Sequence, residues 1–145
     1  MEEEKIQQEA IRNFDEAWEL IDKQNRSKEE DLLALGKAYA SLLNWKSAGG
    51  PTEEARGEWL ISRIYSLLNM GEAAVIHGLN SVNICNLHDI GDFDLAFAYE
   101  AVTRGYGIIG DIKEKGKYYA MACEAAENIE SSEDKDYFLS EFKTA

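Results

Sequence analysis

The chain has 145 residues, a formal net charge of −13 and 45% hydrophobic residues. This length suits one domain with a substantial core, so we predict a single domain over residues 1–145. The negative charge argues against nucleic acid and anionic membranes as partners, because both require clustered lysine and arginine. Charged residues interrupt every apolar run well before the ~20 positions that span a bilayer, and the first residues lack the features of a signal peptide. We therefore expect a cytoplasmic protein.

Apolar residues recur at helical spacing before the single proline and predict two helices, at about 3–24 and 28–46. Ser27 and Glu30 have the spacing of a capping box at the start of the second helix. Pro51 follows two glycines and marks the clearest break in the chain. The two helices before it are expected to pair as an antiparallel hairpin, because the connection between them is short.

Four further helices are predicted after the break, at about 52–69, 72–87, 92–109 and 112–129. Asp111 and Glu114 have the spacing of an N-cap at the start of the last of these four. The short connections again favour antiparallel neighbours.

A final amphipathic helix is predicted at about 133–143, after a polar loop, and it carries Tyr137, Phe138 and Phe142. No segment shows the alternation of a half-buried strand, so the predicted fold class is all-α. We expect the final helix to cap the last of three stacked hairpins, which cover about 3–46, 52–88 and 92–129.

A short pattern, arginine followed two positions later by an aromatic residue, occurs at 12–14, 63–65 and 104–106. Each copy is followed by a helical segment with an internal glycine: Gly36, Gly78 and Gly116. Self-similarity at a period of roughly 40 residues is typical of stacked helical hairpins. We expect these glycines to mark close helix approach, so Gly116→Leu should destabilise the protein more than Gly105→Ala.

The third unit contains an aromatic residue, a glycine–aspartate turn, and a second aromatic residue followed by an alanine: Tyr106, Gly110, Asp111, Tyr119 and Ala122. In these spacings it resembles a tetratricopeptide repeat. We expect the glycine to end one helix, the aspartate to cap the next, and both tyrosines to lie in the core. The resemblance implies a right-handed superhelix of hairpins whose concave face binds proteins or peptides, and it implies no chemistry.

Arg12, Arg63 and Arg104 lie on the first helices of the three predicted hairpins, which the resemblance implies line the groove. Each stands two residues before a core aromatic and so points away from the core side of that aromatic. Three guanidinium groups in one groove would bind carboxylates through paired hydrogen bonds, with Trp59 as an apolar contact beside them. The alternative is that the arginines are solvated or paired with the abundant glutamates and aspartates.

These residues favour a binding module for a protein or peptide, with an acidic or carboxylate-terminated segment as its ligand. One alternative is a self-assembling structural protein, such as a homodimer in which the last helix docks on a second copy. A third hypothesis uses Cys85 and His88, which share one helical face, as metal ligands or as a nucleophile and its base. Too few further ligands and no orienting group are visible for either role, so no metal, cofactor or enzyme activity is predicted.

Overall fold

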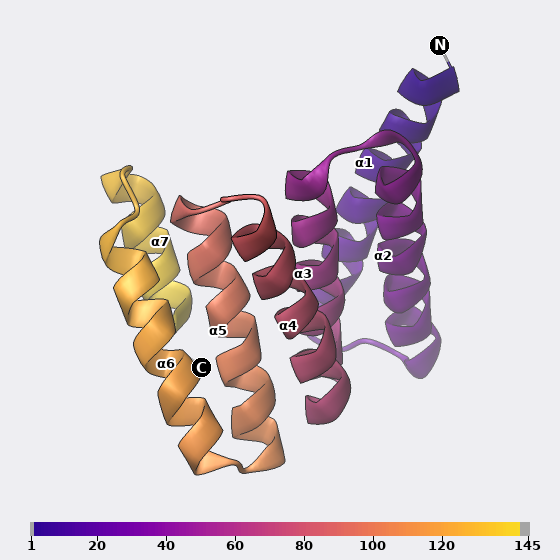
Figure 1. Cartoon of the computed structure of the whole chain (residues 1–145). Coiled ribbons are helices and arrows are strands. Elements are labelled where there is room, and N and C mark those ends of the chain that lie inside the picture. Colours follow the sequence, from indigo (N-terminus) through magenta and orange to yellow (C-terminus); the bar gives the residue numbers. More distant parts are fainter. Residues whose placement is uncertain (1, 143–145) are drawn as a thin grey trace.

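The computed structural model describes residues 2–142, which form seven helices and no strand. The helices are α1 Glu2–Ile21, α2 Lys28–Ala48, α3 Pro51–Leu67, α4 Gly71–Leu87, α5 Asp92–Ile109, α6 Ile112–Glu127 and α7 Ser132–Phe142 (Figure 1). The predicted all-α fold is confirmed; residue 143, which the prediction included in the last helix, lies outside the described residues. None of the described helices combines the length and the apolar character needed to cross a membrane.

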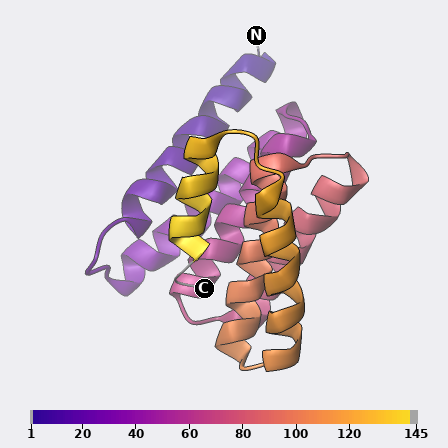
Figure 2. The same cartoon turned by 90° about the vertical axis from the view of Figure 1, so that its left-hand side faces the viewer.

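The helices pair as three antiparallel hairpins, α1 with α2, α3 with α4, and α5 with α6, as predicted. The hairpins stack side by side in chain order, because α2 packs on α3 and α4 packs on α5 (Figure 1). The last helix, α7, folds back against α5 and α6 (Figure 2).

Side-chain hydrogen bonds satisfy backbone groups at the end of α1 and at the start of α2. The Ser27 hydroxyl oxygen accepts a hydrogen bond from the Glu30 backbone N–H at 3.1 Å, and the Glu30 carboxylate accepts one from the Ser27 N–H at 3.0 Å. The predicted capping box is therefore confirmed. Helix α1 ends at Ile21, earlier than predicted, and the Arg26 guanidinium donates a hydrogen bond to the Ile21 carbonyl oxygen at 2.9 Å.

The turn between α5 and α6 also follows the prediction. Gly110 has a φ of 88°, in the left-handed region that glycine adopts without strain, and its N–H donates to the Tyr106 carbonyl at 2.9 Å. The Asp111 carboxylate accepts from the Glu114 N–H at 3.1 Å and so caps α6. These two hydrogen bonds belong to a tight turn, after which α6 runs antiparallel to α5.

The second aromatic position of the repeat-like unit differs from the prediction. Ala122 is buried, but Tyr119 is 46% exposed and stacks on Phe142 of α7, with ring centroids 4.5 Å apart. The ring that stacks on Tyr106 belongs to Tyr118, at 5.7 Å. The placement of Tyr119 in the core was wrong, because its neighbour in sequence takes the position that faces α5.

Close helix approach is found between α4 and α5. A Cβ added at Gly78 would lie 2.9 Å from a valine of α5, and one added at Gly105 would lie 2.6 Å from a valine of α4. A Cβ added at Gly36 or Gly116 would meet no neighbouring atom within 4 Å. The predicted packing role is therefore right for Gly78 and wrong for Gly36 and Gly116, which do not face a neighbouring helix.

A chain of polar side chains joins the first two hairpins. The Tyr39 hydroxyl of α2 lies 2.9 Å from the Tyr65 hydroxyl of α3 and 3.0 Å from Nε2 of His77 on α4. Nδ1 of His77 lies 2.7 Å from a carboxylate oxygen of Glu58, which is buried. Burial raises the pKa of Tyr39, with its hydrogen bond to Tyr65 acting in the same direction, so the hydroxyl stays neutral. These contacts link α2, α3 and α4 and hold the first hairpin on the second.

Candidate functional site

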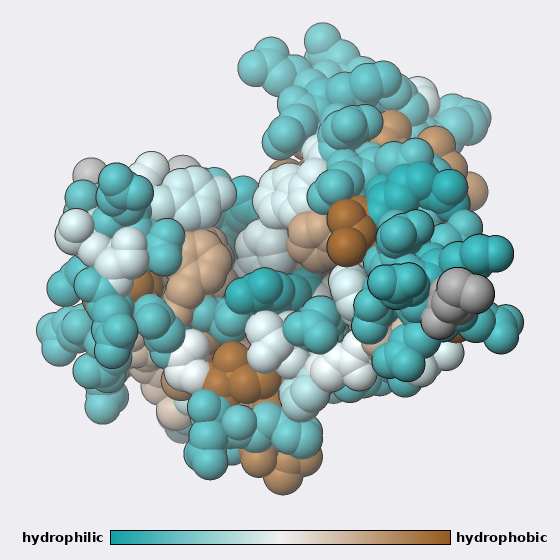
Figure 3. All heavy atoms as spheres, turned by 90° about the horizontal axis from the view of Figure 1, so that it is seen from above, coloured by the Kyte–Doolittle hydropathy of each residue, from teal (hydrophilic) through white to brown (hydrophobic). Residues whose placement is uncertain are grey.

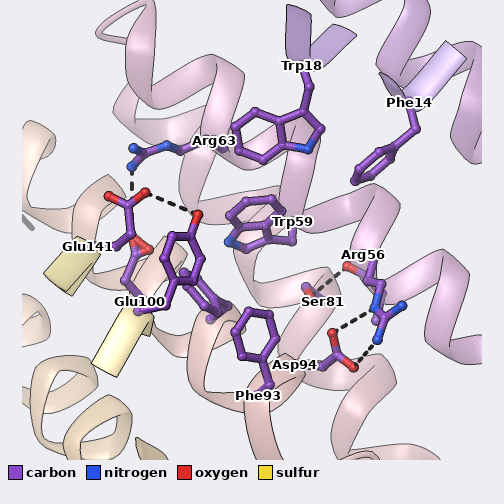
Figure 4. A pocket seen from close by; sticks show the side chains of 13 residues that line it. Phe14, Trp18, Arg56, Trp59, Arg63, Ser81, Phe93, Asp94, Glu100 and Glu141 are labelled. Carbon is purple, nitrogen blue, oxygen red and sulfur yellow. Dashed lines mark hydrogen bonds and ion pairs between the residues drawn. The ribbon is translucent and has the colours of Figure 1, made fainter. Parts of the chain in front are cut away.

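A pocket of about 190 Å³ lies on the face formed by the first helices of the hairpins, with α7 along one side. Viewed towards the helix ends, the surface is hollowed between the C-terminal helices on the left and the N-terminal hairpin on the right (Figure 3). We call it the aromatic pocket after its six ring side chains, which come from four helices: Phe14, Trp18, Trp59, Phe93, Phe97 and Tyr137 (Figure 4).

The rings pack on one another around Trp59. Its ring centroid lies 5.6 Å from that of Trp18 on α1 and 5.6 Å from that of Phe97 on α5. Helices α3 and α5 pack closely, whereas the α1 and α3 backbones lie further apart and the two tryptophans fill the space between them. The indole N–H of Trp59 is buried and has no hydrogen-bond partner within residues 2–142. The pocket thus has apolar walls and one unsatisfied donor.

Ion pairs lie at two ends of the aromatic pocket (Figure 4). At one end the Arg56 guanidinium binds both carboxylate oxygens of Asp94, at 2.9 and 3.1 Å. This bidentate contact raises the pKa of Arg56. At the other end Arg63 lies beside Glu100 and Glu141.

At this second end, the buried Glu100 contacts two arginines. Its Oε1 accepts a hydrogen bond from Nε of Arg104 and lies 3.9 Å from Nη1 of Arg63. Arg104 also donates to the Glu141 carbonyl oxygen at 2.7 Å, which ties α5 to α7. Burial raises the pKa of Glu100, against the attraction of the two arginines, and burial lowers the pKa of Arg63, with the charge of Arg104 acting in the same direction. Two cations therefore share one deeply buried carboxyl group.

The structure brings together three of the four predicted site residues. Trp59 and Arg63, four positions apart on α3, both line the aromatic pocket, and Arg104 joins them through Glu100. Arg12 lies elsewhere: its side chain is 60% exposed and forms an ion pair with a glutamate of its own helix at 3.0 Å. Phe14, two positions further on and about 200° around α1, takes the place facing the pocket. A groove shared by all three arginines was thus a wrong expectation for Arg12, and the pairing of Arg63 and Arg104 with a carboxylate matches the alternative.

Several pocket residues were not predicted. Phe93, Phe97 and Glu100 stand at helical spacing with Arg104 and form one stripe on α5, a signal that the sequence contains. Tyr137 and Glu141 share a face of α7 in the same way. Their place in the pocket depends on where α7 folds back, and no local pattern gives that position.

Cys85 is poorly suited to the nucleophile role considered for it. Its side chain is fully buried, and burial raises the pKa of the thiol to about 11, so little thiolate exists near neutral pH. His88 lies exposed at the end of α4. Within residues 2–142, no three histidine, cysteine, aspartate or glutamate side chains come together in a way that could hold a metal ion.

We expect iodoacetamide to modify the folded protein at Cys123 well before Cys85. Cys123 is exposed, whereas Cys85 is buried and its raised pKa keeps it in the unreactive thiol form. Mass spectrometry of peptides from a time course near neutral pH measures both sites, and denaturant should make their rates similar. Equal rates in the folded protein would contradict the buried position of Cys85.

Comparison with protein-family models, curated proteins and solved structures finds no match for this chain. The likeness to tetratricopeptide repeats therefore remains a resemblance, carried by the turn at Gly110 and Asp111 and by the buried Ala122. Fold and site together define a class: an all-α stack of three helical hairpins with an aromatic pocket on the face of its first helices.

Proposed function

We propose that this protein binds a segment of a partner protein, or a peptide, and that the aromatic pocket holds one apolar side chain of that segment. The observation that carries the proposal is the pocket itself, in which six rings from four helices surround about 190 Å³. A cavity of about 150 Å³ with apolar walls accommodates benzene, so there is room for one aromatic or large aliphatic side chain. Mostly apolar concave pockets with a few polar groups are typical of ligand sites.

The polar groups of the pocket suit a peptide backbone. The buried Trp59 N–H lacks an acceptor among the described residues, and a peptide carbonyl oxygen would supply one. Arg56 is paired with Asp94, and Arg63 lies beside Glu100, so the charges inside the pocket are largely balanced. Its main selectivity is therefore for an apolar group, and buried aromatic side chains of this kind dominate binding energies at many protein interfaces.

Self-assembly through α7 has less support. Phe138 and Phe142, on the apolar face that a second copy would need, are buried within the same chain. We therefore prefer a separate partner. A cytoplasmic location is part of the proposal, because two free cysteines suit a reducing compartment.

Selection of a random linear peptide library on the wild-type protein tests the proposal. The selected peptides should share one aromatic or large aliphatic position. Tyr137→Ala removes a half-exposed wall of the pocket and should weaken their binding about tenfold by titration calorimetry, in the range of a moderate hot spot.

Tyr119→Ala is the matched control. Tyr119 is also half exposed and also contacts α7, through Phe142, but it does not line the aromatic pocket. Binding should stay unchanged in this variant. Selected peptides without a shared apolar position, or an equal loss in both tyrosine variants, would argue against the proposal.

A further inference from the structure

A second depression, of about 290 Å³, lies beside the aromatic pocket near the C-terminal ends of α3 and α5. We call it the basic depression, because its lining includes three cations from three helices: Arg63, Arg104 and Lys115. Among residues 2–142, no carboxylate side chain lines it. Such a concentration of positive charge is unexpected in a chain with a net charge of −13.

Burial works against the positive charge of Arg63 in the basic depression. Glu100 contacts Arg63 and Arg104 from the pocket side, and the charge of Glu141 also acts on Arg63. Even so, burial and the neighbouring Arg104 charge outweigh both carboxylates and lower the pKa of Arg63. An added negative charge on the open side would stabilise the guanidinium.

Lys115 and Ser66 add two unused donors. Lys115 has no ion pair within the described residues, and its side chain crosses Gly107, where an added Cβ would lie 3.4 Å from Nζ. The missing side chain at Gly107 leaves room for the ammonium group to lie against α5. The Ser66 hydroxyl is buried and has no hydrogen-bond partner within residues 2–142. An unsatisfied buried hydroxyl is costly unless a ligand supplies the partner.

We propose that the basic depression binds an oxyanion, a carboxylate or a phosphate, carried by the same partner segment whose apolar side chain enters the aromatic pocket. This inference rests on the proposed function. Arg63 lines both sites, so the apolar and anionic groups of the segment would lie on either side of one guanidinium group. Guanidinium groups bind oxyanions with parallel hydrogen bonds, and the lysine adds a mobile charge. The cations occupy one small depression rather than a broad surface, which fits a single anionic group better than a membrane or a nucleic acid.

The anion itself is tested without any peptide. The full chain is titrated with sodium phosphate in one arm and sodium acetate in another, each compared with sodium chloride at equal ionic strength, and amide NMR signals are followed. Phosphate, acetate or both should shift the signals of Ser66, Gly107 and Lys115 in a saturable manner beyond the chloride effect. The arm that saturates at lower concentration identifies the preferred oxyanion. Shifts no larger than those with chloride in both arms would overturn the proposal.

Lys115→Ala should weaken the saturating anion at least fivefold. Lys113→Ala is the matched control, because it removes the same charge from an exposed position of α6 outside the depression. Lys113 is exposed, and Lys115 is half-buried but has no ion pair within residues 2–142, so both variants should keep the melting temperature of the wild type. Equal anion affinity in the two variants contradicts the assignment.

A peptide arm separates this inference from the proposed function. The library-selected peptides should carry an acidic residue besides the shared apolar one, and they should lose several-fold affinity when it becomes the neutral amide. Lys115→Ala should make that loss smaller, because one of the three cations of the site is then missing. If Tyr137→Ala weakens the peptide while neither anions nor Lys115→Ala have any effect, the basic depression is not a site although the proposed function stands. If anions bind but Tyr137→Ala leaves peptide binding unchanged, the proposed function fails and the anion site stands alone.

Discussion

Replacing Phe138 by alanine is expected to lower the free energy of unfolding by about 3–5 kcal/mol. Phe138 is fully buried, and its ring packs edge-to-face on Phe97 of α5 at 5.0 Å and against Phe142 at 5.2 Å. The smaller side chain leaves a cavity where α7 meets α5. Because α7 is the shortest described helix and packs on the rest through this face, we expect the cavity to loosen its attachment.

Chemical denaturation followed by circular dichroism measures the loss. Leu139→Ala is the control: it removes a neighbouring apolar side chain that is 41% exposed, and it should change the stability by no more than about 0.5 kcal/mol. The Phe138 variant should also lose peptide binding, because α7 carries Tyr137 and Glu141 into the aromatic pocket. A loss of stability as large for Leu139 as for Phe138 would mean that α7 docks by a different face.

The helices were predictable because the signals that set them are local. Helical spacing of apolar residues, the capping box at Ser27 and the turn at Gly110 each involve residues within one or two turns of each other. Such contacts involve residues close in sequence, so the sequence pattern alone indicates them. Short connections then leave antiparallel pairing as the simple arrangement, and the three hairpins follow.

The pocket was only partly predictable, because it depends on distances between segments. Trp59 and Arg63 were predicted to share a face of one helix, and they do. The position of α1 beside α3 depends on the contact between Trp18 and Trp59. The position of α7 over the site depends on the contact between Phe138 and Phe97 of α5. Arg12 was misplaced for this reason: its own helix was predicted well, but the side of that helix that faces the pocket was not.

The contacts of the charged residues were also only partly predictable from the sequence. The pairing of Arg104 with Glu100, four residues earlier on the same helix, follows from helical geometry. The approach of Arg63 to the same carboxylate, and of Lys115 to the basic depression, crosses from helix to helix. A row of arginines in the sequence therefore indicated a charged face, but the described contacts turn two of them into members of a buried ion cluster.

Opposite effects on stability are expected from the same substitution at two glycines, a loss of about 1–2 kcal/mol for Gly105→Ala and a gain of about 0.5–1 kcal/mol for Gly116→Ala. At Gly105 the new Cβ would lie 2.6 Å from Cγ2 and 3.0 Å from the backbone N of Val75, so α4 and α5 would have to separate. That overpacking exceeds the gain from the better helix propensity of alanine. At Gly116 no neighbouring atom lies within 4 Å of the new Cβ, so only the better helix propensity of alanine affects the stability.

Thermal and chemical denaturation of the two variants decides this prediction, and it reverses the order that the sequence suggested. Repeated glycines at similar positions suggest close packing, yet a glycine permits close approach only where a neighbouring helix faces it. Gly116→Leu provides a further check, because a large side chain directed into open space should cost less than the single methyl group added at Gly105. If both alanine variants gained stability, α4 and α5 would pack less closely than these contacts require. If both lost stability, α6 would have to contact a neighbour through Gly116.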